Sequence, residues 1–176
     1  LPVLKSHHSN YGATACIKHY MGVATAYLNS NSHSRTNNGI TGDLMAEIQP
    51  ADLNILDCIW IHANPYDGPW TEYTEATRKD MLVAGLDPVA TDIWSVKNIL
   101  IPTFIENGYS PPWPFPSADP DDPSSKFRTY LDNSMNYLLA GGYTVTNDLD
   151  SIDVTTRSAG DDSPAKLVTG PGATQA

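Results

Sequence analysis

The chain has 176 residues, of which 40% are apolar and 17% are charged, a composition that fits a globular protein and excludes a disordered polyelectrolyte or a coiled coil. Twenty acidic residues against ten basic ones give a formal net charge of -10, which repels nucleic-acid phosphates and anionic lipid surfaces. No apolar stretch reaches the ~20 residues that cross a bilayer. We therefore expect neither a nucleic-acid partner nor a membrane span.

The first third of the chain reads as strand, helix, loop and helix. "LPVLKS" is typical of a short strand, and apolar residues at helical spacing predict a helix over residues 13–28. The polar, turn-rich segment 29–39 is expected to be a surface loop. A short helix is predicted over 43–49, where Pro50 ends it.

"LNILDCIWI", residues 53–61, is the strongest strand signal in the chain and is apolar on both faces except at Asp57. Such runs are typical of strands covered on both sides. After the turn-rich "ANPYDGPW", "MLVAGL" at 81–86 predicts another short strand. Asp87 as N-cap and Pro88 at the first helical position then predict a helix to about residue 100.

The last third begins with a proline-rich loop over 102–123, followed by an amphipathic helix over 124–142. Two short strands are predicted at 143–147 and 151–156. Residues 158–176, rich in Gly, Pro, Ser and Ala, are expected to be a flexible or surface-lying tail. The order of elements predicts one α/β domain over 1–157, with a mixed, mainly parallel sheet whose central strands are parallel and flanked by helices.

Polar residues follow three of the predicted strands. In open parallel sheets, ligands bind outside the carboxyl ends of the strands. The first strand ends in Lys5, His7 and His8; the second ends in His62 and Asn64; the third ends in Asp87, with Asp92 one turn into the next helix. We therefore expect these groups to share one edge of the sheet.

Two chemistries fit such an edge, and the sequence leaves the choice open. Lys5, Lys18, a histidine and the helix start near residue 13 would bind a small anion such as a carboxylate or phosphate. Two imidazoles with Asp87 or Asp92 would hold a divalent metal with open positions. The candidate sets are His7, His8 and Asp92 for proton transfer; Lys5, Lys18, Asn64 and Asp57 for ligand binding, with Asp57 ordering the site from behind; and His7, His62, Asp87 and Asp92 for the metal.

Several of these residues also have purely structural interpretations. His7 and His8 alternate in direction, so at most one is expected to face a site. Asp87 is sufficiently explained as a helix N-cap, whereas Asp92 is not. Cys16 and Cys58 form no C-x-x-C motif, so no iron–sulfur cluster is expected within this chain; the sequence leaves open whether they pair.

Three segments together, "LPVLKSHHSNYGATACIKHYMG", "ADLNILDCIWIHANPYDGP" and "MLVAGLDPVATDIW", resemble domain-of-unknown-function family 362. That family shows a lysine-x-histidine strand end, then a threonine and a lysine, an aspartate in a strand, and an aspartate-proline-valine-alanine-x-aspartate helix start. The resemblance covers about residues 1–101, and "GGYTVTNDLDSIDV" is similar to the family's closing segment. Where the family usually has a glycine after the strand aspartate, this chain has Cys58.

The resemblance implies a redox-associated or metal-assisted enzyme, since family members often accompany iron–sulfur modules or twin-arginine export signals. It also implies an exported, periplasmic or extracellular location and a C-terminal half of a longer protein, whose upstream domain would complete the site. The alternative is an exported, non-catalytic module that binds a partner or self-assembles. Richness in Ser, Thr, Asn and Pro supports it, as does a "PPWPFP" loop that would present Trp113 and Phe115.

Overall fold

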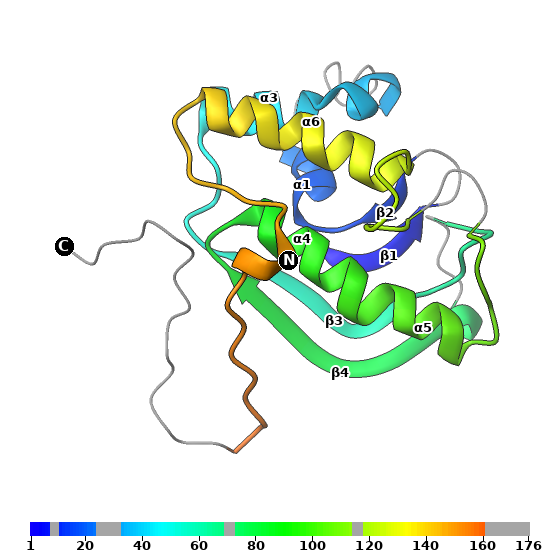
Figure 1. The fold of residues 1–176 in the computed structure, drawn as a ribbon. Coiled ribbons are helices and arrows are strands. Elements are labelled where there is room, and N and C mark those ends of the chain that lie inside the picture. The colour runs from blue at the N-terminus through cyan, green and yellow to red at the C-terminus, as the bar shows by residue number, and fades with distance from the viewer. Residues whose placement is uncertain (8–10, 24–32, 69–72, 114–117, 161–176) are drawn as a thin grey trace.

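Four strands form one mixed sheet in the computed structural model, which describes residues 1–7, 11–23, 33–68, 73–113 and 118–160. The strand order is β2-β1-β3-β4 (Figure 1). The central strands β1 and β3 are parallel, and each edge strand is antiparallel to its neighbour. The predicted α/β fold with parallel central strands is confirmed. The strands are β1 (Val3–His7), β2 (Gly12–Thr14), β3 (Asn54–His62) and β4 (Ala76–Gly85).

Helices α1, α4 and α6 lie on the same side of this sheet (Figure 1). The core between the two layers includes Leu4 and Leu56 from the sheet and Ile93, Leu100 and Phe127 from the helices, all buried. Among the described residues, no helix has the length and apolar character that a bilayer crossing needs. The helical elements are α1 (Cys16–His19), η1 (Tyr20–Val23), η2 (His33–Asn38), α3 (Ile40–Ile48), η3 (Tyr73–Glu75), α4 (Pro88–Ser95), η4 (Val96–Leu100), α5 (Ile101–Glu106), α6 (Lys126–Ala140) and η5 (Leu149–Ser151).

The helix that begins at Pro88 continues past its predicted end through η4 and α5 to Glu106. A proline inside an α-helix removes one hydrogen bond, and its ring clashes with the carbonyl four residues earlier. Pro102 follows a turn of π-helix, Val96–Leu100, whose wider spacing accommodates the ring. The predicted loop from residue 102 therefore starts only after Glu106.

One face of the sheet carries exposed apolar side chains. Burial alternates along β3 and β4, and the exposed fractions are 39% for Ile59 and 63% for Leu82. The prediction that residues 53–61 are covered on both sides is therefore wrong. Helices cover only one face, because β4 returns directly from β3 as an antiparallel neighbour without a crossover helix.

Other predicted elements also differ from the structure. The helix predicted from residue 13 starts at Cys16, because residues 12–14 pair with β1 as strand β2; it ends at Val23 within the described part. Residues 143–147 and 151–156 form no strand. Before η5, the amide of Thr146 instead donates to Oδ2 of Asp87, the N-cap of α4, at 2.7 Å.

Candidate functional site

A histidine and two carboxylates meet at the carboxyl end of β3. His62 is the last residue of β3 and pairs with Ala76, the first residue of β4. Glu75 directly precedes Ala76, so the antiparallel pairing returns it to His62, and its Oε2 lies 2.9 Å from Nε2 of the imidazole. Asp67, in the loop between the strands, completes the group: one ligand atom from each of the three lies within 4.8 Å of the others.

Ser6 on β1 fixes the orientation of the His62 ring. Its Oγ lies 2.7 Å from Nδ1 of His62, donates to the His62 carbonyl at 3.3 Å and accepts from the amide of Asn64 at 3.4 Å. With Nδ1 held by Ser6, Nε2 of the ring faces the Glu75 carboxylate. A ring nitrogen and a carboxylate oxygen 2.9 Å apart share either a proton or a cation.

The loop that carries Asp67 is held tightly against β1. Gly68 has a φ of 111°, and a Cβ at this position would lie 2.4 Å from the carbonyl oxygen of Ser6. The amide of Gly68 donates to Oδ1 of Asp67 at 2.7 Å. At the start of the loop, Nδ2 of Asn107 donates to the carbonyl of Ala63 at 3.0 Å. The Asp67 carboxylate is therefore tied to the next amide, and the backbone on either side of it, at Ala63 and Gly68, is held in place.

The two carboxylates make this end of the sheet electronegative. The pKa of the Tyr109 phenol is raised, first by burial and then by the negative charges of Glu75 and Asp67. The side chain of His62 is 1% exposed, whereas that of Glu75 is 43% exposed. A cation can therefore approach from the solvent side while the imidazole forms the floor of the site.

Four of the residues predicted from the strand ends lie at this edge. Lys5 is the cross-strand partner of His62, and His7 ends β1 with its ring 4.5 Å from that of Tyr11. Asn64 follows His62, and its side-chain oxygen accepts from the amide of Tyr66 at 2.9 Å. His8 lies outside the described residues.

Asp87 and Asp92 lie at the opposite end of β3. Because β4 is antiparallel to β3, its last residue, Gly85, pairs with Asn54, the first residue of β3. Helix α4 therefore begins at the amino end of β3, a full strand length from His62. The expectation that the third strand end joins the same edge is wrong, and the structure does not bring together the predicted metal set of His7, His62, Asp87 and Asp92.

Both aspartates instead bind backbone amides. Asp92 is fully buried, and its Oδ1 and Oδ2 accept from the amides of Cys16 at 2.8 Å and Ile17 at 3.0 Å. Burial raises the pKa of Asp92 to about 7, although these hydrogen bonds oppose the shift. Asp87 caps α4 through the amide of Val89, as predicted for an N-cap. The amides at the start of α1, expected to bind an anion, are thus occupied by Asp92.

The remaining predicted ligands are also separated from His62. Asp57 lies in the middle of β3 on the exposed side of the sheet, where its Oδ1 accepts from the amide of Ile59 at 2.9 Å. This contact stabilises the irregular pairing near residues 58–60, so Asp57 does not order the site from behind. Lys18 is buried on α1, with its Nζ 4.8 Å from the centre of the Tyr11 ring.

A family model described as "Domain of unknown function (DUF362)" matches residues 1–97, more than half of the chain. The chain belongs to this family. The match lies in the N-terminal half of the chain, so the expectation of a C-terminal half is wrong, and residues 141–154 lie outside the match. No curated protein and no solved structure matches the chain. His62, Asp67 and Glu75 all lie within the DUF362 match.

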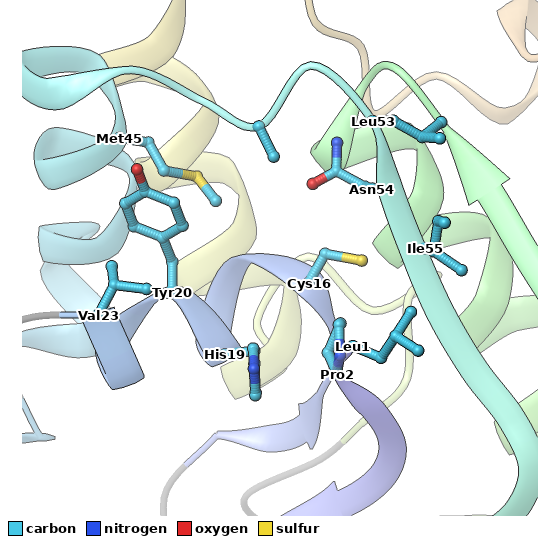
Figure 2. A pocket seen from close by; sticks show the side chains of 11 residues that line it. Leu1, Pro2, Cys16, His19, Tyr20, Val23, Met45, Leu53, Asn54 and Ile55 are labelled. Carbon is cyan, nitrogen blue, oxygen red and sulfur yellow. The ribbon is translucent and has the colours of Figure 1, made fainter.

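The DUF362 domain also contains a pocket of about 250 Å³ beside the amino end of β3. Figure 2 shows Cys16 and His19 from α1 across this pocket from Asn54 and Ile55 on β3. None of the described residues that line it belongs to the predicted site. Cys16 and Cys58 are free thiols, and burial raises the pKa of both, which keeps them protonated and weakly nucleophilic.

The sequence did not identify Asp67 and Glu75 as ligands. Asp67 stands in the turn signal Asp-Gly, which is adequately explained by the turn alone. Glu75 lies in a charged stretch between two predicted strands and directly precedes the first residue of β4. The proline loop gives no support to a docking module: the ring of Trp113 packs on Phe104 at 5.4 Å, and Phe115 lies outside the described residues.

Proposed function

We propose that this DUF362 domain binds one divalent metal ion through Nε2 of His62 and the carboxylates of Asp67 and Glu75. One imidazole and two carboxylates suit Zn²⁺, Mn²⁺ or Fe²⁺, and three protein ligands leave open positions, as in catalytic metal sites. A bound ion of this kind supplies a Lewis acid that polarises a substrate oxygen and acidifies a bound water. The proposed activity is therefore metal-assisted.

The observation that carries the proposal is the 2.9 Å contact between Nε2 of His62 and Oε2 of Glu75. A ring nitrogen and a carboxylate oxygen at this distance are also ligands that one cation can share. Ligands about 2.1 Å from a tetrahedral metal lie about 3.4 Å apart. The three ligand atoms already lie within 4.8 Å of one another, so a rotation of the exposed Glu75 side chain suffices to close the site.

The charges around the group favour a cation over a purely structural ion pair. Among the described residues, neither Asp67 nor Glu75 forms an ion pair with a lysine or arginine. A neutral His62 would leave two adjacent carboxylates uncompensated. In a chain with a formal net charge of -10, such a site attracts cations from solution.

Isothermal titration calorimetry with Zn²⁺ and with Mn²⁺ tests the proposal. We expect one ion per chain, with affinity reduced about tenfold or more in Asp67→Asn and Glu75→Gln, which keep the size of each side chain. Glu106→Gln is the matched control, because this substitution also removes one negative charge but does so at a distant ion pair with Lys79. Equal affinity in all four proteins, or no binding by the wild type, would contradict the proposal.

A further inference from the structure

Two lysines near the first strand end have no acidic partner among the residues that the structure describes. Lys5 is half-buried on β1, and Lys18 on α1 is 7% exposed. The pKa of Lys18 is lowered to about 8, first by burial and then by the positive charge of Lys5. The ion pairs formed within the described part of the chain include neither lysine. This is notable because acidic residues outnumber basic ones by twenty to ten.

Thr14 places a hydroxyl beside Lys5. It is the cross-strand partner of Lys5 in the antiparallel pair β1–β2, so the two side chains share one face of the sheet. Thr14 is 6% exposed, and its Oγ1 is buried with no hydrogen-bond partner in the described part of the chain. A buried polar atom without a partner is costly and points to a missing ligand or water. Lys18 follows Thr14 by four residues along the chain.

Aromatic rings hold the Lys18 ammonium without neutralising it. Its Nζ lies 4.8 Å from the centre of the Tyr11 ring, which in turn packs edge-on against His7 and Tyr130. A cation–π contact orients the ammonium, but a full positive charge remains. The charges of Lys5 and Lys18 also contribute, after burial, to a lowered pKa of His19, so this region of the domain is electropositive.

We propose that Lys5, Thr14 and Lys18 bind a doubly charged oxyanion of the phosphate class. Two ammonium groups match two negative charges, and the Thr14 hydroxyl donates a third hydrogen bond. The start of α1 contributes no amide to this site, because Asp92 occupies those of Cys16 and Ile17. The oxyanion site shares no ligand with the proposed metal site, so either can be disproved without the other.

The test is calorimetric titration with inorganic phosphate at constant ionic strength, with acetate as a singly charged comparison. Lys5→Met and Lys18→Met remove a charge while keeping the length of the side chain. Lys79→Met is the matched control, since Lys79 pairs with Glu106 away from this cluster. We expect phosphate to bind the wild type and Lys79→Met, and to bind Lys5→Met and Lys18→Met about tenfold more weakly or worse.

Thr14→Val separates the proposed site from a diffuse positive potential. This variant changes no charge, yet it removes the donor, so phosphate affinity should fall by about fivefold or more while circular dichroism confirms the fold. Unchanged affinity in Thr14→Val, equal affinity in the three lysine variants, tighter binding of acetate than of phosphate, or no phosphate binding by the wild type would each overturn the proposal.

Discussion

Asp92 on α4 accepts hydrogen bonds from the first amides of α1, with Oδ1 2.8 Å from the nitrogen of Cys16. The start of α1 has no side-chain cap of its own, because Ala15 stands at the N-cap position. A carboxylate from a helix some seventy residues later in the chain performs that function. The contact joins two helices that cover the same sheet face, and it places a titratable group in the core.

The stability of the domain should depend on the protonation of Asp92. Burial raises its pKa to about 7 in the folded chain, above the ordinary value near 3.8. Between these values the folded chain binds more protons than the unfolded chain, so the free energy of unfolding falls as pH rises from about 4 to about 7. The side chain in Asp92→Asn cannot ionise, so the variant should not show this fall in the free energy of unfolding. For the wild type the fall is on the order of 4 kcal/mol between pH 4 and pH 7.

Urea unfolding of both proteins at several pH values measures this difference. Near pH 4, where the wild-type carboxyl is neutral, the two proteins should differ least, and the variant should gain relative stability as pH rises. Asp87 also has a raised pKa, owing first to burial, and its negative charge contributes to the raised pKa of Asp92. Parallel pH profiles for the two proteins would contradict the assignment.

Strand direction is what limited the prediction of the site from sequence. The apolar run in β3 and the cap and proline at the start of α4 identified those elements, since each depends on local signals. The first half of β4, "ATRKD", is polar because it lies at a sheet edge, so it lacks the apolar pattern that predicts a strand. A strand predicted only over residues 81–86 does not determine whether it runs parallel or antiparallel to β3. Asp87 is then expected at the wrong end of the sheet.

Hydrogen-bond partners that are distant in sequence also could not be predicted. Asp92 stood out because a carboxylate one turn into a helix gains little locally, and the structure shows that it is buried. Its partners, the amides of α1, follow only from the packing of α1 on α4. His62 and Asn64 could be predicted as strand-end residues, whereas Glu75 joins them only through the register that pairs His62 with Ala76.

Gly68→Ala should destabilise the domain more than the same substitution at an ordinary loop glycine. Gly68 has a positive φ, and a Cβ there would meet the carbonyl oxygen of Ser6 at 2.4 Å. We expect the free energy of unfolding to fall by about 3 kcal/mol or more, because the loop must move. Gly108→Ala is the control: its φ is +89° and nothing lies within 4 Å of the added Cβ, so the loss should be about 1 kcal/mol.

Thermal and urea unfolding of the two glycine variants separates the effect of the steric clash from that of the positive φ. Both variants have an alanine at positive φ, but only Gly68→Ala also has the clash. The same displacement would move Asp67, so affinity for Zn²⁺ or Mn²⁺ should fall in Gly68→Ala and not in Gly108→Ala. Equal losses of stability in the two variants would show that the loop is not pressed against β1.

Two serine-to-alanine substitutions should have opposite effects. Ser95 is fully buried in α4, and its hydroxyl has no hydrogen-bond partner. Ser95→Ala removes a buried polar atom and adds helix propensity, so the free energy of unfolding should rise by about 1 kcal/mol. Ser125 is the N-cap of α6, where its Oγ accepts from the amide of Arg128 at 3.1 Å; Ser125→Ala should lower stability by about 1 kcal/mol. Chemical denaturation measures both, and a loss of stability in Ser95→Ala would mean that its hydroxyl is satisfied in solution.

Ser6 should act on the proposed metal through His62 without touching the ion. Its Oγ, 2.7 Å from Nδ1, holds the ring in the orientation that turns Nε2 toward Glu75. In Ser6→Ala the ring loses this partner, and metal affinity should fall about tenfold or more while one ion still binds per chain. Ser125→Ala, which should lower stability at the N-cap of α6 away from these ligands, is the control for a general loss of stability. Calorimetric titration with Zn²⁺ distinguishes the outcomes: a change of stoichiometry would make Ser6 a ligand, and an unchanged affinity would show that the orientation of His62 is fixed by the fold alone.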